Sequence, residues 1–126
     1  MNEKILKRKV EQEDFYLVYL KTLNGHLGLT NRELDVLVQL CKTQASFSDE
    51  GYSDEQLSKI VFSSGSRQLI REHLQISPFN LNNIIKVLRA KKILLTVGKR
   101  YYINPRIFVS NKDKEYSINF KIEVTT

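Results

Sequence analysis

The chain has 126 residues, of which 41% are hydrophobic and 27% charged, and its formal net charge is +6. These values are typical of one small globular domain, and the length supports one hydrophobic core and not two independent ones. No apolar run reaches the ~20 residues of a membrane-spanning helix, the charged N-terminus has no signal-peptide core, and the single Cys41 excludes an internal disulfide and a cysteine-based zinc site, as expected of a cytoplasmic protein.

The N-terminal quarter is predicted as an arm followed by a helix. Residues 1–12 mix lysines with a few apolar residues and are expected to be flexible. Residues 14–24, DFYLVYLKTLN, fit helical spacing and strand alternation alike. Their composition favours a strand, whereas the leading acid and the closing Asn24-Gly25 favour a helix. We predict a helix over 13–25, with His26 in the turn after it, that covers the core or contributes to a dimer contact.

Two capping boxes mark the next helices. In Thr30-Asn31-Arg32-Glu33 the threonine and glutamate side chains satisfy exposed backbone donors, which predicts a helix over 30–42 with Cys41 facing inward. The polar stretch 43–52 is predicted to be a mobile loop. Ser53-Asp54-Glu55-Gln56 opens a short helix over 53–62, separate from the helix after it, and Ser66 is expected to cap that following helix.

A helix, a tight turn and a longer helix are predicted over 66–91. The first helix, 66–74, directs Leu69, Ile70 and Leu74 to the core, and 75–77 make the turn. Ser77 is a favourable N-cap and Pro78 suits the first position of the longer helix. That helix has a buried face at helical spacing and an opposite face with amides, cations and no carboxylate. The buried residues are Leu81, Ile84, Ile85 and Leu88.

Three strands are predicted after this helix. Residues 93–97 and 100–104 form a hairpin around Gly98-Lys99, whose glycine suits a type II′ turn, with Leu94 opposite Ile103 and Thr96 opposite Tyr101. Beyond it, 116–124 alternate apolar and polar residues in strict period two, which predicts a strand within a C-terminal extension, 108–126.

Charge is concentrated in one part of the chain. Residues 66–107 contain nine basic residues and one acid, Glu72, and therefore carry +8, which leaves −2 for the remainder. A solvated surface mixes both signs, so this segregation favours a polyanionic partner.

The stretch ISPFNLNNIIKVLRAKKILL followed by GKRYYINPRIF resembles winged helix-turn-helix domains of prokaryotic, plasmid and phage proteins. The resemblance covers 66–107, with the 30–42 helix as the first helix of a 30–107 core. It implies that 77–91 is the recognition helix in the major groove, and that the 93–104 wing, with Gly98-Lys99 at its tip, lies on the DNA backbone. The expected DNA-binding residues are Arg67, Arg71, Asn80, Asn82, Asn83, Lys86, Arg89, Lys91, Lys99, Arg100 and Tyr101.

The expected fold is a single mainly α domain with a small β-sheet (α+β), a winged helix-turn-helix with an added N-terminal helix and a C-terminal strand. The expected function is non-enzymatic double-stranded DNA binding in the cytoplasm of a prokaryotic cell or phage-infected host, in transcription regulation or replication. No catalytic, metal, cofactor or small-molecule site is expected from the motifs. The other expected partner is a second copy of the chain, in a homodimer formed through residues 14–24 or 116–124. The alternative is a winged-helix protein-interaction or virion-associated module.

Overall fold

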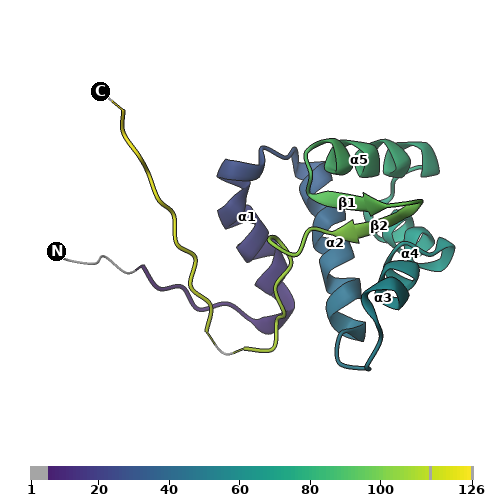
Figure 1. Ribbon diagram of the computed structural model, residues 1–126, viewed down its shortest axis with the longest axis horizontal. Coiled ribbons are helices and arrows are strands. Elements are labelled where there is room, and N and C mark those ends of the chain that lie inside the picture. The colour runs from purple at the N-terminus through teal and green to yellow at the C-terminus, as the bar shows by residue number, and fades with distance from the viewer. Residues whose placement is uncertain (1–5, 114, 126) are drawn as a thin grey trace.

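The computed structural model describes residues 6–113 and 115–125 (Figure 1). It is mainly helical with one small antiparallel sheet, so the predicted α+β class is confirmed. The elements follow in chain order: a 3-10 turn Gln12–Asp14, α1 Phe15–Leu27, α2 Asn31–Phe47, α3 Asp54–Val61, α4 Ser64–Leu74, α5 Pro78–Ala90, β1 Leu94–Val97 and β2 Arg100–Ile103.

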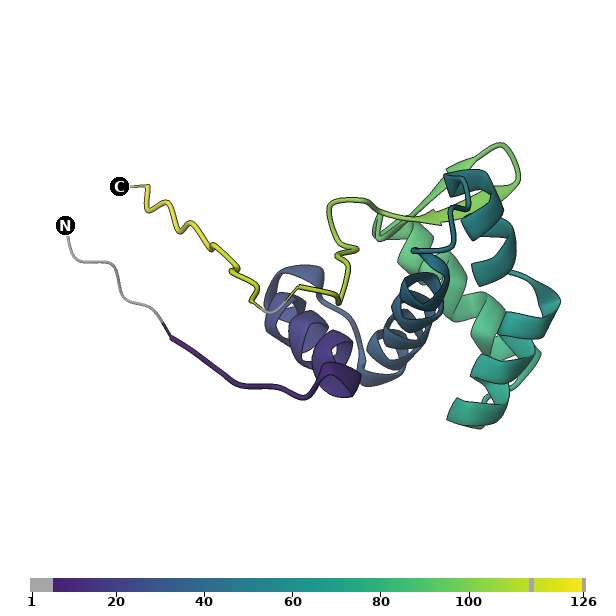
Figure 2. The ribbon, with the colours of Figure 1, turned by 90° about the horizontal axis from the view of Figure 1, so that it is seen from below.

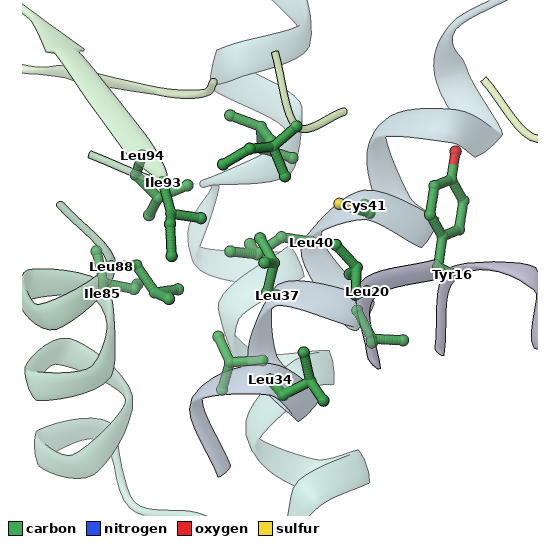
Figure 3. Close-up of a cluster of buried hydrophobic side chains, with 14 of the residues drawn as sticks. Tyr16, Leu20, Leu34, Leu37, Leu40, Cys41, Ile85, Leu88, Ile93 and Leu94 are labelled. Atoms are coloured by element: carbon green, nitrogen blue, oxygen red, sulfur yellow. The ribbon is translucent and has the colours of Figure 1, made fainter. Parts of the chain in front are cut away.

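Helix α2 lies at the centre and packs against α1, α3, α4 and α5. Its capping box is formed as predicted: Thr30 Oγ1 accepts from the N–H of Glu33, and Glu33 Oε1 accepts from the N–H of Thr30. Figure 3 shows Leu37 and Leu40 of α2 between Leu20 of α1 and the side chains of α5 and β1. Cys41 is fully buried, and this burial raises the pKa of its thiol to about 12. The thiol is therefore an inert core group.

The predicted turn between two helices is present at residues 75–77. Ser77 Oγ accepts from the N–H of Asn80 at 3.1 Å, and Pro78 occupies the first turn of α5. Gln75 ends α4 in the left-handed conformation, with φ 54°. Because this conformation reverses the chain direction within three residues, Ile76 packs against the core and α5 returns across α2.

The hairpin register is confirmed, with Leu94 paired with Ile103 and Thr96 with Tyr101. Gly98 has φ 63°, whereas the φ of Lys99 is not positive, as a type II′ turn requires. The hairpin packs on α5 through β1 and on α3 through β2, where the hydroxyl of Ser58 donates to the carbonyl of Tyr101.

Three predicted helix boundaries are wrong. Helix α1 continues past Asn24-Gly25 and includes His26, because Gly28, with φ 67°, supplies the left-handed cap. Helix α2 continues to Phe47, which shortens the predicted 43–52 loop, because Ala45 is buried against the core and extends the inward face. Helix α4 begins at Ser64, since Ser63 rather than Ser66 is the N-cap and accepts from the N–H of Ser66.

Leu69 and the C-terminal strand are also corrected. Leu69 is 68% exposed, because α4 turns the neighbouring Ile70 toward the core and leaves Leu69 off the buried face. Residues 116–124 are not a strand of this structure, because no neighbouring strand in 6–113 or 115–125 supplies a hydrogen-bonded ladder. The alternation of apolar and polar residues suits a sheet, but a strand forms only when the free edge of another strand lies close enough to pair with it.

The chain after the hairpin is hydrogen-bonded to two tyrosines of α1. The hydroxyl of Tyr16 donates to the carbonyl of Val109 at 2.6 Å, and that of Tyr19 to the carbonyl of Ile107 at 2.7 Å. Burial raises the pKa of both tyrosines. These bonds explain why α1 lies against the core, with Tyr16 and Leu20 buried.

At the N-terminus, residues 1–5 of the predicted 1–12 arm lie outside the described residues, and 6–11 form no helix or strand. None of the described helices combines the length and apolar character needed to cross a membrane.

Gln75→Gly is expected to raise the free energy of unfolding by about 0.5–1 kcal/mol, because a left-handed backbone is strained for a residue with a Cβ. The matched control is Gln68→Gly in the exposed interior of α4, which makes the same chemical change in a right-handed helix. It should lower the free energy by about 1 kcal/mol. Urea denaturation of both variants measures the difference, and a loss of stability at both positions contradicts the assigned turn.

Candidate nucleic-acid interface

The exposed side of α5 carries one continuous row of side chains. Phe79, Asn82, Lys86 and Arg89 are separated by three or four positions, so they follow one another along one flank of the helix. All four are exposed, and Asn80 and Asn83 near the helix start are exposed as well. The opposite side is fixed in the core by Leu81, Ile85 and Leu88. We call Phe79, Asn82, Asn83, Lys86 and Arg89 the α5 row.

Phe79 is the member of the α5 row that the sequence did not single out. It is 72% exposed at the start of the helix, three positions before Asn82 and four before Asn83. The signal was present in the sequence, since Phe79 falls outside the Leu81, Ile85 and Leu88 face. A large exposed aromatic ring beside amides suits an apolar contact with a ligand or partner.

Arg67 connects α4 to the α5 row. Its Nη1 donates to Oδ1 of Asn82 at 3.2 Å, and its Nε donates to the carbonyl of Phe62 at 3.1 Å. The guanidinium therefore orients the Asn82 amide. The Nδ2 donor of that amide points away from the hydrogen bond to Arg67. Arg67 was predicted to contact DNA directly, and here it orients another member of the predicted set.

The hairpin residues that were predicted to contact DNA differ in their surroundings. Lys99 is exposed at the hairpin turn, and no ion pair of its side chain occurs within 6–113 and 115–125. Arg100 forms an ion pair with Glu55 of α3, which offsets its charge. Tyr101 is half-buried against Phe62, with ring centroids 5.6 Å apart, and packs against the core. Of these three residues, Lys99 is therefore the one most accessible to a partner.

Lys91 is held away from the α5 row. Its Nζ donates to the carbonyl of Gly28 at 2.6 Å and lies 3.6 Å from Oε1 of Glu33. It thus joins the end of α5 to the connection between α1 and α2. Arg71 stands apart in another way, half-buried on α4 with no side-chain hydrogen bond or ion pair to the described part of the chain.

The structure therefore divides the predicted residues by exposure and by partner, with Asn80 exposed beside the α5 row and Arg71 half-buried on α4. The α5 row and Lys99 are exposed, and Arg67 supports the row from α4. Lys91 and Tyr101 stabilise the fold, and Arg100 is shared with an acid. Figures 1 and 2 both place α1 and the terminal segments at one end of the molecule and α3 and α4 at the other.

No protein-family model, curated protein or solved structure matches this chain. The arrangement of α4, α5 and the hairpin is therefore interpreted from its own geometry.

Lys91→Met is expected to lower the free energy of unfolding by about 0.5–1 kcal/mol, because it removes the bond to Gly28 and the ion pair with Glu33 while keeping most of the aliphatic chain. The control Lys86→Met removes the same charge from the α5 row, where no partner is present among the described residues, and should change stability by less than about 0.5 kcal/mol. Chemical denaturation measures both values. Equal losses of unfolding free energy in the two variants would mean that Lys91, like Lys86, makes no stabilising contact.

Proposed function

We propose that this protein is a non-enzymatic double-stranded DNA-binding protein of winged helix-turn-helix type. The observation that carries the proposal is the α5 row, an exposed helix face of amides, cations and one aromatic ring, with no carboxylate. Helix α5 follows a three-residue turn and precedes a hairpin with Lys99 at its tip. A helix presented in this way fits the major groove, and a hairpin beside it reaches the phosphates.

The charge distribution supports the proposal. Residues 66–107 carry +8 from nine basic residues and one acid, whereas the rest of the chain carries −2. DNA is a dense polyanion, and cations that neutralise its phosphates release bound counterions and supply much of the affinity. Action in a prokaryotic or phage-infected cytoplasm, in transcription regulation or replication, is part of the same proposal.

Each member of the site has a different task in this proposal. Lys86, Arg89 and Lys99 attract phosphates, whereas Asn82 and Asn83 lie near the start of α5, the part of a recognition helix that reaches base edges. Arg67 presets the Asn82 amide, which lowers the entropy lost when that amide binds a base. Phe79 is placed for an apolar contact with a thymine methyl group.

Alanine variants of Lys86, Arg89 and Lys99 should each make the plot of log binding constant against log salt less steep by roughly 0.9, because each removes one phosphate contact. Arg100→Ala should have a smaller effect, since Arg100 is already paired with Glu55. The control is Lys42→Ala on α2. Titrations of random and genomic duplexes over a range of salt concentrations measure these slopes. Equal slopes for all five variants and the unchanged chain argue against this face.

Base readout by the α5 row needs separate titrations on preferred and random duplexes. Alanine at Asn80, Asn82, Asn83 or Phe79 should cost about 1–3 kcal/mol on the preferred site for any residue that contacts a base, with little change on random DNA. Uracil in place of thymine removes only the methyl group. It should weaken binding of the unchanged chain but not of Phe79→Ala. Losses that are equal on both duplexes, or absent from all four variants, remove base readout from α5.

The second candidate is a protein-interaction or virion-associated module. The exposed Leu69 and Phe79 and the apolar residues of 115–125 favour it, since exposed apolar groups bind proteins more readily than phosphates. The titrations on preferred and random duplexes separate the two candidates, because a module of this kind binds duplex DNA only through its basic charge and therefore binds all sequences alike.

A further inference from the structure

Residues 115–125 form an extended segment whose two edges are both open. No backbone N–H or carbonyl of this segment makes a hydrogen bond within 6–113 or 115–125, and only the hydroxyl of Tyr116 does so, with Ser110 and Asp113. An extended chain with free backbone donors and acceptors is a template for pairing with another strand.

One face of the segment is apolar and only half of it is covered. Tyr116 lies on Phe15 at one end of α1, with ring centroids 4.3 Å apart, and Phe120 stacks on His26 near the other end at 4.7 Å. Ile122 and Val124 continue the same alternation and are 86% and 82% exposed. Figures 1 and 2 show the chain running from α1 into open space. The apolar face therefore extends beyond the surface that α1 provides.

The charges on the opposite face favour a second copy of this segment as the partner strand. Lys121 and Glu123 lie two positions apart on one side, with Nζ and Oε1 3.6 Å apart. When two copies of the segment pair antiparallel about Ile122, Lys121 of each copy lies opposite Glu123 of the other. A relative shift of two residues instead sets Lys121 opposite Lys121, or Glu123 opposite Glu123. A shift of one residue sets apolar against polar side chains.

We propose that the protein forms a homodimer in which residues 119–125 of two copies pair as antiparallel strands centred on Ile122. In this register Phe120 lies opposite Val124, and the exposed apolar side chains form one continuous face. A two-stranded ribbon alone is marginal in water, but here α1 of each copy supports its strand where Phe120 stacks on His26, and it holds the chain just before the strand where Tyr116 lies on Phe15. The proposal does not depend on DNA binding.

Sedimentation velocity of the full chain and of two charge-reversal variants tests the register. Lys121→Glu places two acids opposite two acids, and Glu123→Lys places two cations opposite two cations. Each variant alone should dimerise roughly tenfold more weakly than the unchanged chain, because two attractive cross-strand pairs become repulsive. An equimolar mixture of the two variants restores opposite charges in both pairs and should recover the original dimerisation. The matched controls, Lys42→Glu and Glu50→Lys, reverse exposed charges away from the segment and should leave it unchanged.

Recovery in the mixture supports the proposal, since a change of fold in either variant cannot be repaired by adding the other. A chain that stays monomeric at all concentrations overturns it and leaves the segment to a strand from another protein. A dimer that neither variant weakens uses a different surface, such as the outer face of α1. Weakening without recovery in the mixture overturns the register. DNA titrations of the same variants test the proposed DNA binding separately from dimerisation, because neither Lys121 nor Glu123 belongs to the α5 row.

Discussion

The fold depends on the burial of helix α2 by neighbours on several sides. Leu37, Leu40 and Cys41 are buried, and α1, α3, α4 and α5 all pack on this one helix. A short chain has little apolar area available, so using one helix as the shared surface lets four others bury their apolar faces with few residues. The hairpin then closes the core from the side of α5, where Ile93 and Leu94 are buried.

This arrangement gives the two ends of the molecule different properties. On one side of α2, α1 and the chain after the hairpin are joined by the hydroxyls of Tyr16 and Tyr19. On the other side lie α4, α5 and the hairpin, within the stretch 66–107 that carries a net charge of +8. The proposed strand pairing of 119–125 uses the first end, so it leaves the α5 row uncovered in each copy. In such a dimer two copies of α5 are exposed, and the proposed DNA binding would use them on two half-sites, the arrangement found in helix-turn-helix dimers.

Contacts between elements decide how each basic side chain in the charged region is used. Arg67 and Lys91 are both cations that sequence reasoning assigned to DNA. Arg67 instead bonds Asn82 between α4 and α5, and Lys91 bonds Gly28 in the connection between α1 and α2. Charge segregation therefore overstates the number of cations that are free for a polyanionic partner, since some of the cations satisfy carbonyls and acids of the protein itself. Lys86 and Lys99 have no such partner within the described residues, so they are the better probes of a polyanion.

The sequence alone determined the elements whose signals are local. The caps at Thr30 and Ser77 and the turn at Gly98 depend on side chains and φ values within four residues, and all three were predicted and confirmed. The tertiary structure decided features that depend on distant partners. These include the exposure of Leu69, the attachment of Lys91 and the absence of a ladder for 116–124 in the described chain. Period-two alternation shows which face of a segment is apolar, but a strand exists only where another backbone supplies its hydrogen bonds.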